Sequence, residues 1–266
     1  MTPVRVAVAA AGLAAALAAC GGGTPGTAGS PSPAGVVVSP PLEPTDDLPV
    51  DLPDAELLFS CGDEIAFGTT ALFEPPGAEL APSAPAAALR AFLAQPGVEV
   101  DALPDAGWRL VADEPDAVLF IAGDPRQDGA LHRVVVERSA EGWRVSGWGG
   151  CRPFVMLGDG LVAAQWAFDP AAARPGPGST TITALVTERS CSSGRPADGR
   201  IAPPFISYGN EAILVVFGVR PLPGNQDCPG APPSRVAFEL REPLGNRRLL
   251  DGAFFPPRDP ADPDQD

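Results

Sequence analysis

The sequence predicts an α+β, mainly β fold: a helix on an antiparallel, cone-like meander, followed by a small disulfide-pinned β-sandwich or barrel. Two observations predict this class. Residues 84–94 alone repeat apolar side chains at helical spacing, whereas many short runs have the apolar and β-branched composition of strands. The chain also has 34 prolines and 30 glycines among its 266 residues, enough to supply loops between many short strands.

The first folded part is expected over residues 56–154, as an α+β domain. Its helix should hold Pro85 in the first turn and end before Pro96-Gly97. Asp128-Gly129 and Glu141-Gly142 have the composition of tight turns between strands. The strands of this part are predicted at 57–61, 108–112, 118–122, 131–138 and 143–148. A helix followed by such a meander is similar to the order found in cystatin-like or NTF2-like folds.

The second folded part is expected over residues 155–257, as a β-sandwich-like domain. Loops rich in proline and glycine separate its strands, a pattern that favours a small sandwich or barrel. The strands are predicted at 161–168, 180–188, 211–220 and 235–241. Residues 258–266 are rich in proline and aspartate, and we expect them to form a disordered acidic tail.

The N-terminus has the three-part layout of a secretory signal. Arg5 is its only charge, residues 6–17 are apolar, and small residues precede the cysteine in Leu17-Ala18-Ala19-Cys20. This tetrapeptide resembles the lipobox of bacterial lipoprotein precursors. The resemblance implies that residues 1–19 are a signal peptide and that Cys20 becomes the lipidated first residue.

Residues 20–55 are expected to form a disordered tether behind the lipid. They are rich in glycine, proline, serine and threonine, so they have little apolar surface to offset the entropy of ordering. The lipid would then hold the folded parts at the cell membrane, on its extracytoplasmic face.

The five cysteines form an odd set that the lipobox explains. With Cys20 used by lipid, Cys61, Cys151, Cys191 and Cys228 remain in a compartment that permits disulfides. Four cysteines allow three pairings, and we favour Cys61–Cys151 with Cys191–Cys228 because each bridge then closes one half of the chain. A redox or metal site is disfavoured, since the sequence has no Cys-x-x-Cys pair and a single histidine.

The charge of the chain restricts its partners. It has 33 acidic and 18 basic residues, a formal net charge of −15, and every basic residue is an arginine. Nucleic-acid binding needs clustered basic residues, and only Arg241, Arg247 and Arg248 come close together in the sequence. We therefore expect no nucleic-acid partner. The expected partners are the membrane, through the lipid, and an unidentified envelope protein or small ligand.

Candidate catalytic residues are few. His132, the single histidine, lies in a predicted strand and no Gly-x-Ser-x-Gly motif accompanies it, so we interpret it as a half-exposed strand residue. The carboxylates of Asp113, Glu114 and Asp116 could in principle hydrolyse a glycoside, but their place in a turn favours a solvated surface. We expect no catalytic residue, no metal and no cofactor.

The four tryptophans offer the remaining route to a ligand. Trp108, Trp143, Trp148 and Trp166 all lie in predicted strands, where core packing is the commoner role and sugar stacking the alternative. Trp143 and Trp148 are five residues apart, so on a regular strand they would face opposite sides and one would be exposed.

One further resemblance concerns residues 180–257. The segments Glu188–Gly194, Asn225–Gly230, Glu242–Gly245 and Leu249–Gly252 resemble uncharacterised envelope lipoproteins of high-GC Gram-positive bacteria. The resemblance implies a secreted β-module and no activity. We therefore expect a non-enzymatic, lipid-anchored protein that presents a binding surface. The alternatives are a module that binds cell-wall glycan and a hydrolase that uses carboxylates or His132.

Overall fold

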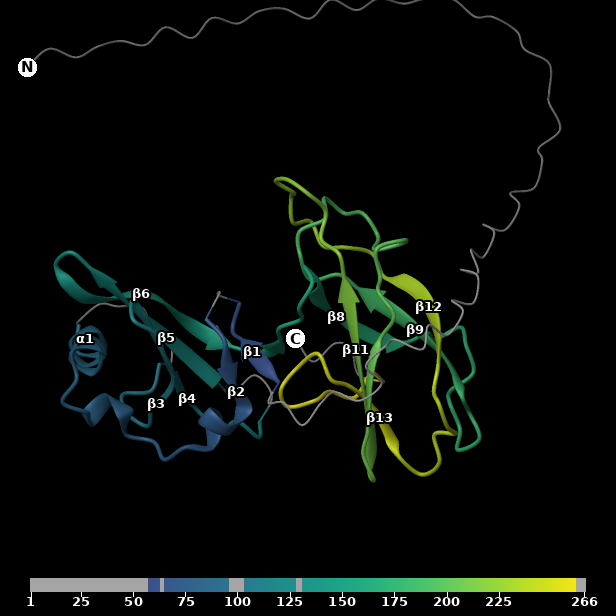
Figure 1. Ribbon diagram of the computed structural model, residues 1–266, viewed down its shortest axis with the longest axis horizontal. Coiled ribbons are helices and arrows are strands. Elements are labelled where there is room, and N and C mark those ends of the chain that lie inside the picture. The colour runs from purple at the N-terminus through teal and green to yellow at the C-terminus, as the bar shows by residue number, and fades with distance from the viewer. Residues whose placement is uncertain (1–56, 63–64, 96–102, 128–130, 262–266) are drawn as a thin grey trace, which may run out of the picture. The chain divides into compact units, whose positions relative to one another are not determined.

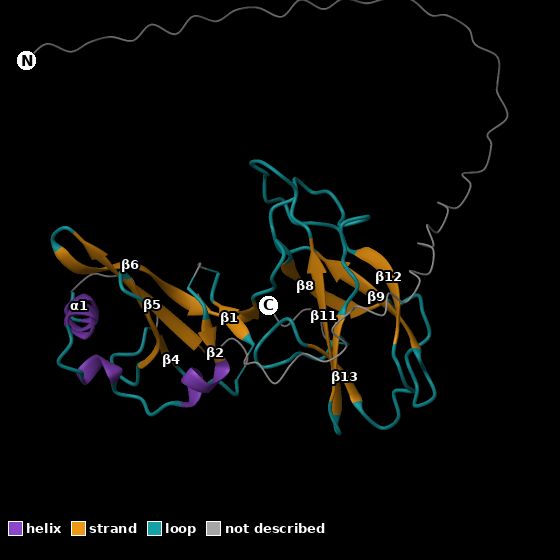
Figure 2. Ribbon diagram, in the orientation of Figure 1, coloured by secondary structure: helices purple, strands orange, loops and turns teal. Residues whose placement is uncertain are grey.

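The computed structural model describes residues 57–62, 65–95, 103–127 and 131–261 (Figure 1). These residues form the mainly β structure that the sequence predicts, with antiparallel sheets and one α-helix. The helical segments of the described residues come before strand β3 (Arg109–Asp113), and the described residues from β3 onward are strand and loop (Figure 2). The predicted signal peptide, the tether up to residue 55 and the turns at Pro96-Gly97 and Asp128-Gly129 lie outside the described residues.

A four-stranded antiparallel sheet has the order β3-β4-β5-β6, so each strand pairs with the next in sequence. Short turns suffice for such a meander, and Gly142, with φ of 118°, provides the left-handed conformation at the β5–β6 turn. The predicted strands of this region are confirmed with small shifts of their ends. The strands are β3 (Arg109–Asp113), β4 (Ala117–Ala122), β5 (Leu131–Ser139) and β6 (Gly142–Cys151).

Helix α1 (Ala84–Leu93) covers one face of this sheet, over β5 and β6 (Figure 1). It begins as predicted: the Ser83 hydroxyl accepts a hydrogen bond from the Ala86 N–H at 3.3 Å, and Pro85 lies in the first turn. Its apolar stripe packs on the even-numbered residues of β4 and β5. Members of this core are Ala86, Leu89, Phe92, Trp108, Val118, Phe120, Val134 and Val136.

The other face of the four-stranded sheet is also buried. It packs under the 3-10 helix η1 (Thr69–Phe73) and a small sheet of order β2-β1-β7, whereas a second 3-10 helix, η2 (Ala78–Leu80), packs beside α1 against the first core. The small sheet consists of β1 (Leu58–Ser60), β2 (Phe67–Gly68) and β7 (Phe154–Val155). The core on this side contains Phe59, Phe67, Leu72, Leu119, Ile121, Val135, Val216 and Phe254. Residues from both predicted folded parts therefore share this core.

The C-terminal strands form one six-stranded sheet with the order β10-β11-β8-β9-β12, and β13 pairs with β11. The β11–β13 pair is parallel, while the other pairs of this sheet are antiparallel. The strands are β8 (Val162–Phe168), β9 (Thr181–Thr187), β10 (Phe205–Tyr208), β11 (Ala212–Val219), β12 (Ser234–Glu239) and β13 (Arg248–Asp251).

This sheet curls over its own aromatic core. The Phe217 ring of β11 lies 5.5 Å from the Phe238 ring of β12, although two strands separate β11 from β12 in the sheet. Trp166 of β8 packs edge-on against both rings, with centroids 6.2 Å away. Among the described residues β12 does not pair back to β10 or β13, so the sheet stays open and the barrel alternative is wrong.

Strand β11 is buried on both faces. Ile213, Val215 and Phe217 point into the aromatic core, while Val216 points into the core that contains Phe59 and Phe254. Gly218 and Gly252 let other segments approach this second face closely. A Cβ atom on Gly252 would lie 3.0 Å from Cγ2 of Val216 and 3.2 Å from Cβ of Leu214.

The first residues of the predicted acidic tail are ordered against this sheet. Arg258 is buried, and its backbone N–H and C=O both pair with Asp251, at 3.0 and 2.8 Å. The Pro260 carbonyl accepts the Phe168 N–H at 3.1 Å. Composition predicted disorder from residue 258, whereas these backbone bonds hold the chain in place as far as residue 260; residues 262–266 lie outside the described range.

Gly252→Ala is expected to lower the free energy of unfolding by about 1–3 kcal/mol, because the new methyl group must displace Val216 and Leu214. Gly150→Ala is the matched control: Gly150 is an exposed position of β6, and nothing lies within 4 Å of its Cβ position. Urea unfolding of both variants, at unchanged m-value, tests this. Equal stability of the two would contradict the close packing at Gly252.

Candidate functional site

The four cysteines after Cys20 form two disulfides, in the favoured pairing. Cys61 follows β1 and bonds Cys151 at the end of β6, with Cα atoms 5.0 Å apart. Cys191 and Cys228 join two loops of the C-terminal half, with Cα atoms 4.5 Å apart. These separations are ordinary for disulfides. Both bridges act as the structural staples that the sequence predicts.

His132 and the acidic turn are not brought together. His132 pairs with Ala122 at one end of β4 and is half-buried. Asp113, Glu114 and Asp116 are exposed in the β3–β4 turn, at the opposite end of β4. A strand of six residues spans roughly 20 Å, too far for one catalytic group. The described part of the chain also holds no cluster of three or more His, Cys, Asp or Glu side chains that could bind a metal.

The tryptophans divide between core and surface. Trp108 and Trp166 are fully buried, as the core interpretation predicts. Trp143 and Trp148 lie on the same face of β6, so the predicted opposite orientation is wrong. A β-bulge explains this: Val135 pairs with Gly147 but Val136 pairs with Val145, and the extra residue restores Trp148 to the face of Trp143. Trp148 rests on Phe92 and is 47% exposed.

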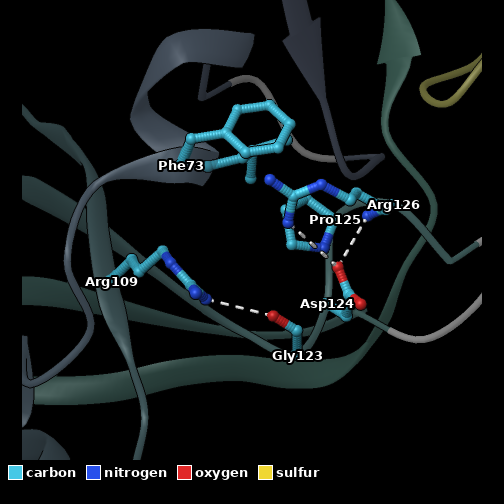
Figure 3. Close-up of a pocket in the computed structure, with 7 residues that line it drawn as sticks. Phe73, Arg109, Gly123, Asp124, Pro125 and Arg126 are labelled. Atoms are coloured by element: carbon cyan, nitrogen blue, oxygen red, sulfur yellow. Dashed lines mark hydrogen bonds and ion pairs between the residues drawn. The ribbon is translucent and has the colours of Figure 1, made fainter.

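A shallow hollow of about 370 Å³ opens between η1 and the β4–β5 loop (Figure 3). None of its residues was a sequence-based candidate, because they are far apart in the chain and form no local motif. The hollow is lined by Leu72, Phe73, Arg109, Gly123, Asp124, Pro125 and Arg126. Its size is at the lower end of the range for small-molecule sites.

Arg109 forms one wall of the hollow and is fixed by backbone carbonyls. Its Nε donates to the Glu74 carbonyl at 2.8 Å, and its Nη1 donates to the Gly123 carbonyl at 3.0 Å (Figure 3). Gly123 takes a left-handed φ of 113°, which turns the chain out of β4 and exposes that carbonyl. These bonds use two of the five guanidinium N–H groups. Among the described residues, no carboxylate pairs with Arg109.

Phe73 and Arg126 form the opposite wall. The Arg126 guanidinium lies 5.1 Å from the centre of the Phe73 ring, a cation–π distance, and its side chain is 75% exposed. The Asp124 carboxylate bonds within its own loop: one oxygen accepts the backbone N–H of Arg126 at 3.0 Å and lies 3.9 Å from the Arg126 guanidinium, an ion pair, and the other accepts from the Gln127 side chain at 3.2 Å. The hollow thus presents two guanidinium groups, one carboxylate and one aromatic face.

A second polar centre, at Asp251, is buried. The Asp251 carboxylate accepts the backbone N–H of Trp166 at 3.1 Å and that of Ala253 at 2.9 Å. Burial raises the pKa of Asp251 to about 7, against the opposing effect of these two donors and of the charges on Arg258 and Arg189. Both guanidinium groups also stack on the Phe254 ring, at 4.4 and 5.0 Å.

A third centre joins Glu188 to Arg200. The Arg200 guanidinium donates two hydrogen bonds to the Glu188 carboxylate, one at 2.9 Å. The Ser190 hydroxyl donates a third to the same carboxylate at 2.7 Å. Burial alone would raise the pKa of Glu188, but the hydrogen bonds from Arg200 and Ser190 and the Arg200 charge bring it below the usual value. Arg200 also donates to the Pro196 and Arg220 carbonyls, so this centre closes loops.

Comparison with known proteins finds no matching family model, no matching curated protein and no matching solved structure. The likeness to cystatin-like or NTF2-like folds and to envelope lipoproteins therefore stays a prediction. None of the described helices is long and apolar enough to span a membrane.

The raised pKa of Asp251 predicts a pH-dependent contribution to stability. The unfolded carboxyl ionises near pH 3.8 and the folded one near 7, so this contribution is complete below about pH 4 and is lost as the pH rises to 7. Asp251→Asn keeps one side-chain oxygen as an acceptor and replaces the other by an NH2 group, so one of the two backbone N–H groups loses its partner. This loss should lower the free energy of unfolding by about 1–3 kcal/mol at low pH.

The stability advantage of the wild type over Asp251→Asn should therefore be greatest near pH 4 and should fall steadily as the pH rises toward 7, because the buried wild-type carboxyl resists ionisation. Urea unfolding at several pH values measures this difference. A gap that widens with pH would show that folded Asp251 is ionised throughout, and would contradict the raised pKa.

Proposed function

We propose that this chain is a lipid-anchored, extracytoplasmic, non-enzymatic protein that presents a ligand- or protein-binding surface in the cell envelope. The observation that carries the proposal is the use of the cysteines. The two disulfides take up Cys61, Cys151, Cys191 and Cys228, and Cys20, directly after Leu17-Ala18-Ala19, is the one cysteine left in the sequence. Two structural disulfides favour an oxidising compartment, where a lipobox cysteine would be processed.

The surface that such a protein would present lies before the C-terminal six-stranded sheet in the chain. All six large apolar side chains that are well exposed in the described residues occur between residues 58 and 156. Single exposed apolar residues are ordinary. Phe73 differs from the other five because it borders the hollow and its ring makes a cation–π contact with the Arg126 guanidinium. We therefore place the binding surface at the hollow.

Lipidation at Cys20 is tested by metabolic labelling with an alkyne analogue of palmitate in a bacterial host. The wild-type chain should incorporate the label, and Cys20→Ser should lose it, because the thiol is the attachment point. The double variant Cys191→Ser/Cys228→Ser removes two other cysteines and should keep the label. An unlabelled wild type, or a labelled Cys20→Ser chain, would refute the anchor.

A module that binds cell-wall glycan is a second candidate, favoured by Trp148. This ring is half-exposed and supported from below by Phe92, with centroids 5.0 Å apart, so it could stack on a sugar. If so, Trp148→Ala should weaken retention on insoluble peptidoglycan about tenfold, the effect of losing about 1.4 kcal/mol of contact. Leu110→Ala, at another exposed apolar side chain, is the control. Equal retention of both variants would reject this candidate.

A further inference from the structure

We propose that the hollow beside η1 binds a small organic carboxylate that carries an aromatic or apolar group. The inference rests on the proposed binding function and names its ligand class. A free aromatic acid and the C-terminal carboxylate of a peptide share this chemistry.

The Arg109 guanidinium is fixed by the protein itself. Its two bonds to the Glu74 and Gly123 carbonyls hold the guanidinium in place before any ligand arrives. A ligand would therefore not have to immobilise a flexible side chain. Three N–H groups of a planar fork remain, and such a fork matches the two oxygens of a carboxylate.

The charges around the hollow favour a monovalent anion. Arg126 forms an exposed ion pair with Asp124 at 3.9 Å, which leaves Arg109 as the guanidinium of the hollow with no carboxylate partner among the described residues, whereas the chain as a whole has a formal net charge of −15. A local excess of positive charge on so acidic a protein favours an anion at this point. The Asp124 carboxylate, which stays close to the site, disfavours a dianion such as a phosphate monoester. A single carboxylate is the best electrostatic fit.

The apolar lining of the hollow favours a ligand with an aromatic or apolar group. The Phe73 ring is 47% exposed and borders the hollow (Figure 3), and the other two apolar lining residues, Leu72 and Pro125, are buried. Phe73 is held from behind by an edge-on contact with Phe255 at 6.0 Å. A ligand with an aromatic group could cover Phe73 while its carboxylate meets Arg109.

Equilibrium dialysis of the detergent-purified full chain tests the inference with N-acetyl-L-phenylalanine, a carboxylate beside an aromatic ring. The uncharged N-acetyl-L-phenylalaninamide is the matched ligand control. We expect saturable binding of the acid with a Kd of about 1 mM or below, and at least about tenfold weaker binding of the amide.

Variants assign the binding to the hollow. Arg109→Gln should weaken it about tenfold, and Arg109→Lys should restore only part of it, because lysine keeps the charge and loses the fork. Should Arg109→Gln fail to fold, Arg126→Gln serves, since its exposed side chain is not needed for folding; it should weaken binding about threefold. Arg144→Gln, at an exposed position of β6, should change nothing.

Equal binding of acid and amide, or equal loss in Arg126→Gln and Arg144→Gln, would overturn the inference. Lipid labelling at Cys20 is independent of these measurements. A labelled chain that binds no carboxylate refutes the ligand class alone, whereas an unlabelled chain that binds it refutes the anchor and leaves the site standing.

Discussion

The burial of strand β11 on both faces is the constraint on which most of the structure depends. Its odd-numbered residues complete the aromatic core around Trp166, and Val216 completes the core that reaches Phe59. A strand with two buried faces needs a continuous apolar sequence, and Ile213–Val219 has one. The same strand therefore couples the C-terminal sheet to the core beneath the four-stranded sheet. This arrangement brings neighbouring segments so close that a side chain at Gly218 or Gly252 would meet atoms at about 3.0 Å, and both positions therefore require glycine.

The Asp251 carboxylate accepts a buried backbone N–H of β8 that the pairing around β11 leaves without a strand partner. Strand β8 pairs with β11 over residues 162–164 and with β9 over residues 165–168, while β13 occupies the next part of the β11 edge. The Trp166 N–H therefore has no strand partner on that side, and the Asp251 carboxylate accepts it. An unsatisfied buried N–H would be costly, which explains why a carboxyl group is kept in a place where burial raises its pKa. We interpret Asp251 as structural, despite its perturbed titration.

Sequence reasoning succeeded where a single physical pattern dominates. The helical repeat at α1 and the long apolar runs of β4, β5 and β11 were each predicted from period and composition. It missed β10 and β13, because prolines precede Phe205 and two arginines precede Leu249, so neither short strand stands out. The side-chain orientation along β6 failed for another reason: a bulge changes the alternation, and no residue type marks its position. The hollow could not be predicted at all, since Phe73, Arg109 and Arg126 meet only through the pairing of β3 with β4 and the docking of η1.

The exclusive use of arginine links the fold to the proposed site. An ammonium group is a point charge with three donors, whereas a guanidinium has five donors in a rigid plane and can bond the backbone while leaving N–H groups available. Arg200 uses this capacity to hold two carbonyls and Glu188 together. Arg109 uses the same capacity to join the end of η1 to the end of β4, but its remaining N–H groups meet a hollow in place of a carboxylate. The two backbone hydrogen bonds that join η1 to the end of β4 therefore also hold the Arg109 guanidinium in place before a ligand binds. The difference between Arg200 and Arg109 is the presence of an internal anion, and the proposed ligand would supply the anion that Arg109 lacks.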